Sequence, residues 1–296
     1  MRITNKMISR NLLATLTKNR QRASELQMDI ATSRKVRRPS DDPGAMIQIE
    51  RINRQISKND QYTRNINQAS GFISASMTAM DSLSEQLGEA REVALQGASG
   101  TLNADARASL ASVIDQLIEN TLDLANTEYN NRHIFAGTLT TTRPFTRNLD
   151  VITYNGNDKP IEGKVGPDSQ VNYNMTGSDI FNPAGGTDIF QALIDLKQGL
   201  ENNDDAQIEA AVGTLDGAYK QVINKTAEIG ALQNRLDLTE EMIASKNLSL
   251  SERLSEIQDT DVVEALVQHE ILENAILTGL KTMSQTIQTT LADFVS

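Results

Sequence analysis

Few residues in this chain have the types and spacing that catalysis requires. The two histidines, His133 and His269, lie far apart, and no H-E-x-x-H motif or Gly-x-x-x-x-Gly-Lys-Ser/Thr phosphate loop is present. Adjacent acids occur at 41–42, 204–205 and 240–241, but no calcium-loop spacing surrounds them. Helix caps and solvated helix faces are the simpler interpretation of these acids. The chain contains no cysteine, which excludes thiolate catalysis and cysteine-ligated metals. We therefore expect no enzyme activity, no cofactor and no metal.

The charge and hydropathy of the whole chain argue against two classes of partner. The formal net charge is −11, whereas nucleic-acid binding needs a dominant basic face. No apolar run approaches the ~18–20 residues of a membrane helix, so we expect no membrane insertion. The N-terminus lacks the apolar region of a cleaved secretory signal. Because it is rich in arginine and poor in acids, an organelle transit peptide is an alternative.

The two ends of the chain carry opposite charge. Residues 1–40 contain ten basic and two acidic residues, and residues 255–296 contain seven acidic residues and one basic residue. Opposite charge favours pairing between the ends and disfavours pairing of like ends. Both ends also carry apolar residues at three- and four-residue spacing. We predict terminal arms that pair and assemble through Leu12, Leu16, Leu26, Ile30, Leu266, Leu277, Leu280, Ile287, Leu291 and Phe294.

A basic cluster marks the end of the first predicted helix, near residue 33. Cationic side chains suit a helix C-terminus. Asp42 can then cap the next helix, and Pro43 fits its first position. Nucleic acid or a membrane surface is an alternative partner for the basic cluster, but we prefer acidic residues of the same or neighbouring chains. The predicted inter-domain segment contains Arg34, Arg37, Arg38, Asp41, Asp42 and Pro43.

Long helices follow on both sides of a different central region. Heptad rows predict one helix from residue 43 to about 95, another at 103–131, and a third of about 45 residues, roughly 65 Å long, around 215–257. Most of the last helix's companion row is polar, so that this face is either solvated or meets neighbouring subunits. The predicted bundle seam contains Ile66, Ile73, Leu87, Leu215, Val222, Ile229, Leu236 and Ile243.

Residues 138–187 are rich in Thr, Asn, Gly and Pro and predict short strands at 151–154, 161–165 and 170–173. The expected fold class is therefore mainly α with a small β insertion, in which the N- and C-terminal segments form a long antiparallel helical bundle or coiled coil. We expect three regions: terminal arms (1–40 with 255–296), a helical bundle (41–137 with 188–254) and a β region (138–187).

Four stretches, at 33–44, 125–138, 229–235 and 254–294, resemble the bacterial flagellin family, which includes flagellins and their junction relatives. They occur in the family's order and cover essentially all of the chain outside the β insertion. The segments Asp41–Gly44, Phe135–Phe145, Tyr154–Gly156 and Leu291–Ser296 are more similar to the junction members than to flagellin itself.

The resemblance implies a structural protein of the bacterial flagellum that is exported unfolded without a cleaved signal and is located outside the cell. It implies self-assembly into a layer with hook-associated protein 1 and flagellin as neighbours, and an export chaperone at the C-terminal arm. In such proteins the arms line an inner tube and the β region faces outward. The alternatives are flagellin, a secreted coiled-coil effector or adhesin, and a filament protein with an enzymatic insertion. Because the arms contain few core residues, we also expect them to be largely disordered in the free monomer and to fold on assembly.

Overall fold

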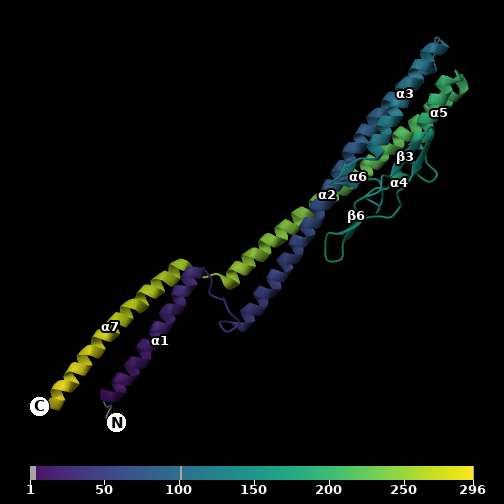
Figure 1. The fold of residues 1–296 in the computed structure, drawn as a ribbon. Coiled ribbons are helices and arrows are strands. Elements are labelled where there is room, and N and C mark those ends of the chain that lie inside the picture. Colours follow the sequence, from purple (N-terminus) through teal and green to yellow (C-terminus); the bar gives the residue numbers. More distant parts are fainter. Residues whose placement is uncertain (1–4, 101, 296) are drawn as a thin grey trace. The chain divides into compact units, whose positions relative to one another are not determined.

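The computed structural model describes residues 5–100 and 102–295, but not the side chains at 5, 6, 8, 9 and 285–295. The described residues form the helices α1 (Asn5–Thr32), α2 (Pro43–Gly97), α3 (Ala104–Ala125), α4 (Gly177–Phe181), α5 (Ile189–Glu201), α6 (Asp205–Gln258) and α7 (Val262–Val295). Between α3 and α4 lie the strands β1 (Glu128–Tyr129), β2 (Arg132–His133), β3 (Phe145–Asn148), β4 (Val151–Tyr154), β5 (Glu162–Lys164) and β6 (Gln170–Asn172). They pair in sequence order as three antiparallel two-stranded sheets. The predicted fold class is confirmed (Figure 1).

The chain divides into two compact units, one formed by residues 1–57 and 246–296 and the other by residues 58–245. The first unit contains α1, α7, the start of α2 and the end of α6. The second contains the rest of α2 and α6, with α3–α5 and all the strands. The division into three regions expected from the sequence stays a prediction.

In the first unit, α1 and α7 lie side by side and run in opposite directions (Figure 1). The helix ends have local causes. After α1, Ser33 adopts a φ of 55°, which does not continue the helix. Asp42 Oδ1 accepts a hydrogen bond from Ala45 N (2.9 Å), and α2 begins at Pro43, as predicted. Asp261 Oδ1 accepts from Val263 N (2.9 Å) and so caps α7.

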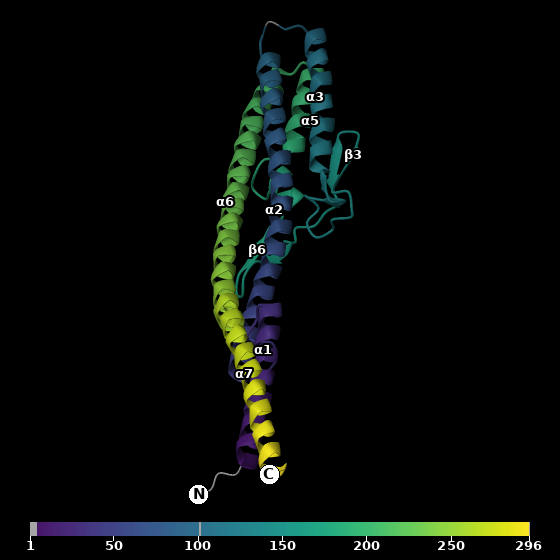
Figure 2. The same ribbon diagram turned by 90° about the vertical axis from the view of Figure 1, so that its left-hand side faces the viewer.

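In the second unit, the β region lies beside the long helices (Figure 2), and the buried side chains of both form one hydrophobic core. Aromatic rings join the two parts. Phe145 of β3 lies 5.0 Å from Phe181 of α4 and 5.3 Å from Phe190 of α5, measured between ring centroids. These contacts fix the β3–β4 hairpin against the helices, since aromatic pairs add to the stabilisation from buried area.

The helix predicted at 103–131 ends earlier than expected. The α3 helix ends at Ala125, and the next residues form the β1–β2 hairpin, in which Asn130 and Asn131 adopt φ values of 51° and 61°. Asn126 explains the early end, because its side chain donates to Phe145 O (3.0 Å) and accepts from Phe145 N (2.9 Å). A tertiary contact therefore overrides the local helical pattern.

The predicted strands at 151–154, 161–165 and 170–173 correspond to β4, β5 and β6. The sequence did not predict β3 or the short α4. The β3–β4 turn contains Leu149, which adopts a φ of 57° and is 85% exposed. This conformation normally favours Gly, Asn or Asp, so the turn had no recognisable sequence signal.

Candidate assembly interface

The helices α1 and α7 meet along a narrow seam. On α1, Leu16 and Ala23 are buried, and on α7 so is Ala265. Gly279 lies so close to Leu16 that a Cβ atom there would be 2.7 Å from Leu16 Cδ2. Small residues therefore permit the close approach of the two helices. The other predicted α1 positions, Leu12, Leu26 and Ile30, have the same heptad spacing and are partly buried.

The predicted leucines of α7 are less buried than the small residues of the seam. Leu266, Leu277 and Leu280 are 51%, 65% and 41% exposed, although Leu277 lines a cavity with Ala23 and Ser24 of α1. The α7 helix carries apolar residues on more than one face. The face with Ala265 and Gly279 packs against α1, because its small residues let the two helices come close together. The role of the leucines in assembly stays a prediction. Ile287, Leu291 and Phe294 lie among the side chains outside the described part of the structure.

The segments that precede α2 and α7 are tied to each other by their backbones. Arg34 and Asp259 form an antiparallel β-bridge. Next to it, Lys35 N donates to Gln258 O (2.8 Å), and Val36 is buried. The chain therefore leaves α1 and enters α7 from neighbouring points, which favours pairing of the two helices over pairing with a distant partner.

Two of the predicted inter-domain residues, Arg37 and Asp41, stabilise the segment between α1 and α2, which we call the crossing. Arg37 Nη2 lies 2.8 Å from Asp29 Oδ1 on α1. Burial raises the pKa of Asp29, and Arg37 opposes that shift. Asp41 Oδ2 accepts hydrogen bonds from the backbone N of Arg38 (2.9 Å) and Arg37 (3.1 Å), and these donors lower the pKa of Asp41. Asp41 thus holds the turn that leads into α2.

Beside this crossing lies a cavity of about 690 Å³ with a cationic wall. Arg37 forms an ion pair with Asp29. The guanidinium groups of Arg34 and Arg38 have no ion-pair partner among the described residues. Both residues are exposed. The cavity can therefore accept carboxylates from outside the chain. Its lining consists of Met28, Ala31, Thr32, Arg34, Arg37, Arg38 and Gln258.

The predicted bundle-seam residues lie together in the core of the second unit, and none of them is more than 7% exposed. Burial of complete aliphatic side chains is worth about 1.5–3 kcal/mol each. This seam is therefore a large source of stability. It contains Ile66, Ile73 and Leu87 from α2 and Leu215, Val222, Ile229, Leu236 and Ile243 from α6.

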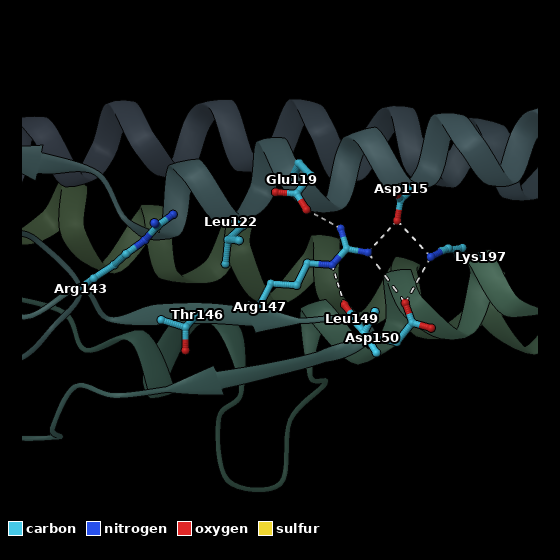
Figure 3. Close-up of a pocket in the computed structure, with 9 residues that line it drawn as sticks. All are labelled: Asp115, Glu119, Leu122, Arg143, Thr146, Arg147, Leu149, Asp150 and Lys197. Carbon is cyan, nitrogen blue, oxygen red and sulfur yellow. Dashed lines mark hydrogen bonds and ion pairs between the residues drawn. The ribbon is translucent and has the colours of Figure 1, made fainter.

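A charged cluster that the sequence did not predict attaches the β3–β4 hairpin to α3 (Figure 3). Arg147 on β3 donates from Nη2 to Asp115 and from Nη1 to Glu119, both at 2.6 Å. Its Nε donates to Leu149 O (2.7 Å), which braces the turn described above. The Arg147 side chain is only 13% exposed, so these contacts are partly shielded from water.

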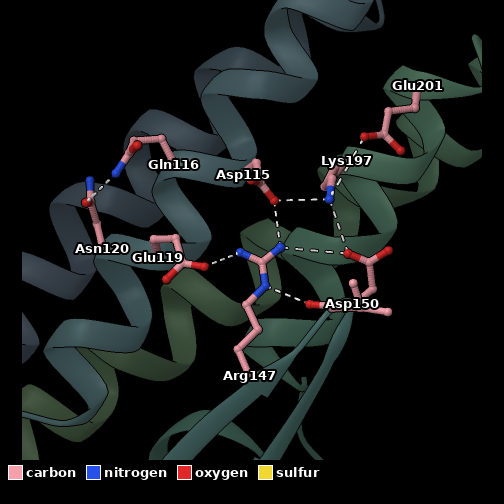
Figure 4. A network of polar contacts seen from close by, with 9 residues as sticks. Asp115, Gln116, Glu119, Asn120, Arg147, Asp150, Lys197 and Glu201 are labelled. Carbon is pink, nitrogen blue, oxygen red and sulfur yellow. Dashed lines mark hydrogen bonds and ion pairs between the residues drawn. The ribbon is translucent and has the colours of Figure 1, made fainter.

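Lys197 extends the same cluster to α5 (Figure 4). Its Nζ lies 3.0 Å from Asp115 and 3.2 Å from Asp150. The hydrogen bond from Arg147 and the contact with Lys197 lower the pKa of Asp115. The adjacent cavity has a volume of about 780 Å³, but Arg147 and Lys197 are already paired with carboxylates. The cluster therefore acts as a structural link, and local spacing could not reveal it because its members come from separate segments.

The two histidines make separate local contacts. His133 Nδ1 is 2.9 Å from Asn126 O, and its Nε2 is 3.3 Å from Glu128 Oε1. His269 is partly buried, with Nε2 4.0 Å from Glu273. No group of three or more His, Cys, Asp or Glu side chains in the described residues could hold a metal ion. Within that same part of the chain, no helix is long and apolar enough to cross a membrane.

Comparison with known proteins gives full-length relatives. The chain is 25% identical to flagellar hook-associated protein 3 of Escherichia coli over 95% of both chains. It is 24% identical to the protein of the same name from Salmonella typhimurium over 96% of both. The flagellin of Bacillus subtilis is 24% identical, over 94% of this chain and 92% of the relative.

Solved structures show the same fold. A flagellar hook-associated protein from Vibrio parahaemolyticus matches with a TM-score of 0.69 and 25% identity, over 74% of this chain and all of that one. The flagellar junction protein FlgL of Legionella pneumophila matches with a TM-score of 0.60 and 17% identity, over 72% of this chain and all of that one, and this shows the fold alone.

Family models match both helical ends. Residues 3–140 match the bacterial flagellin N-terminal helical region, and residues 212–294 match the bacterial flagellin C-terminal helical region. Together these two matches cover most of the chain and include α1–α3 and nearly all of α6 and α7. The chain therefore belongs to the bacterial flagellin family.

Proposed function

We propose that this protein is a structural subunit of the bacterial flagellum that forms the junction layer between hook-associated protein 1 and the flagellin filament. One observation carries the proposal: the match to hook-associated protein 3 of Escherichia coli runs through 95% of both chains, terminal arms and β region included. The junction-like residues at 41–44 and 135–145 support the same choice.

The geometry of α7 supports assembly through the terminal arms. After pairing with α1, this helix still exposes Val263, Leu266, Ile271, Leu277 and Leu280, each more than 40% exposed. Apolar residues at helical spacing that remain exposed in one chain are typical of surfaces that other chains cover. We propose that neighbouring subunits cover them, so that residues 1–40 and 255–296 form the inner tube of the layer.

We also propose, from the family resemblance, that the protein leaves the cell unfolded without a cleaved signal and reaches the outside through the flagellar export channel. An export chaperone that covers the exposed apolar side chains of α7 would prevent premature association. The small β region, 138–187, would then face outward from the layer.

The test is to count and locate the protein in purified, intact flagella by quantitative mass spectrometry and an antibody label. A few copies confined to the hook–filament boundary support the proposal. Abundant label along the filament would instead indicate flagellin, which the match to the Bacillus subtilis protein keeps as the second candidate. Absence from flagella would favour a secreted coiled-coil effector or adhesin.

A further inference from the structure

One face of α7 combines apolar and acidic side chains at heptad spacing. Leu266, Glu270, Glu273, Leu277 and Leu280 follow one another at intervals of three and four residues, and all are exposed. Glu270 has no ion-pair partner among the described residues. Glu273 lies 4.0 Å from His269 Nε2 and lines a cavity with Arg20 of α1, without an ion pair to that arginine among the described residues. We call these five residues the acidic stripe.

The cavity beside the crossing between α1 and α2 is cationic and partly apolar, and so complements the acidic stripe in charge and hydrophobicity. Met28, which is 50% exposed, and Ala31 give it an apolar floor. Arg34 and Arg38 supply two guanidinium groups that the described part of the chain leaves unpaired. A guanidinium group binds carboxylates through two parallel hydrogen bonds, so two unpaired arginines favour a partner with two carboxylates. We call this site the arginine pocket.

The acidic stripe of the same chain is in the wrong place to fill the arginine pocket. The backbone of Arg34 forms a β-bridge with that of Asp259, just before α7, and Glu270 is eleven residues further along. At ~1.5 Å per helical residue, that separation is roughly 16 Å along the helix axis, well beyond ion-pair distance. A second copy has no such restriction.

We propose that the acidic stripe of one subunit docks in the arginine pocket of a neighbouring copy, with Glu270 and Glu273 paired to Arg34 and Arg38. Leu277 packs on Met28 and Ala31. The contact joins two different surfaces, so each subunit offers both and the contact can repeat around a layer. This inference rests on the proposed function, since it needs copies that assemble next to one another.

Charge reversal tests the contact in cells that lack the wild-type protein. Arg34→Glu/Arg38→Glu in one variant and Glu270→Lys/Glu273→Lys in another each place like charges together. Each variant alone should lower the number of copies in purified flagella by about tenfold or more. Co-expression should restore the number, because the reversed pocket of one variant meets the reversed stripe of the other. No loss with either variant, or loss without restoration by co-expression, would overturn the proposal.

Cysteine cross-linking gives a second readout that does not depend on assembly defects, because the chain has no natural cysteine. Ala31→Cys and Leu277→Cys, carried by separate co-expressed chains, should form a disulfide-linked pair in intact flagella. As the matched control, Leu277→Cys with Leu238→Cys, which is 68% exposed on α6, should not.

The two readouts separate the possible failures. If the protein is present at the hook–filament boundary but Ala31→Cys and Leu277→Cys do not cross-link, the contact is wrong and the proposed function stands. If cross-links join Leu277→Cys to another protein, such as a chaperone, the occupant of the acidic stripe is not a second copy. Absence of the wild-type protein from flagella would refute the proposed function itself.

Discussion

Replacement of Arg147 by Gln should loosen the β3–β4 hairpin and destabilise the second unit. The variant loses ion pairs with Asp115 and Glu119 and a hydrogen bond to Leu149 O. Asp115 and Glu119 are 42% and 49% exposed, so solvent screening limits each ion pair to about 0.5–1 kcal/mol. The hydrogen bond adds about 1 kcal/mol. We therefore expect a loss of about 2–3 kcal/mol in the free energy of unfolding.

The assay is denaturant unfolding followed by circular dichroism, together with amide exchange of residues 145–154. Arg143→Gln is the matched control, because Arg143 lines the same cavity but is exposed and has no ion-pair partner among the described residues. The control should change stability by less than about 0.5 kcal/mol. Equal midpoints and equal exchange for the two variants would refute the assignment of the cluster as a structural link.

The same prediction has a pH dependence. Because the pKa of Asp115 is lowered in the folded state, its contribution to stability is fully present above the unfolded-state pKa of about 4. The contribution is lost as the pH falls through the lower folded-state pKa. The difference between wild type and Arg147→Gln should therefore be largest near neutral pH and should narrow below about pH 4. A difference that grows on acidification would contradict this account.

Three further predictions concern the helices. Gly279→Leu should weaken the α1–α7 pair of the assembled protein by about 1–3 kcal/mol, because Leu16 already fills the space beside Gly279, and faster amide exchange of both helices in purified flagella would show it. As a control, Gly230→Ala adds a Cβ where no atom lies within 4 Å and should stabilise α6 by about 0.5–1 kcal/mol. Ile229→Asp should cost about 3 kcal/mol or more because it buries a charge in the bundle seam, and an unchanged denaturation midpoint would show that the seam is misassigned. Amide exchange of the free monomer should be fast in α1 and α7 and slow in residues 58–245, and strong protection of both terminal helices would contradict folding on assembly.

The sequence alone determined the helical architecture and the bundle seam. An uninterrupted heptad row predicted α6, and its residues Leu215 and Leu236 are fully buried in the structure. Asp42 and Pro43 marked the start of α2 because capping depends on neighbours in the chain. A helix cap depends on neighbouring residues and a heptad row on regular spacing, so both can be predicted from the sequence alone.

Only the tertiary structure decided which face of α7 meets α1. The leucines of α7 have larger side chains than Gly279. Because Gly279 has no side chain, Leu16 of α1 can come close to the α7 backbone there, and this contact fixes the pairing face. Likewise, Asn126 ends α3 early through hydrogen bonds to Phe145, and Arg147 of β3 donates to carboxylates on the separate helix α3. Such choices depend on the distance between segments far apart in sequence, and periodicity within one segment carries no information about that distance.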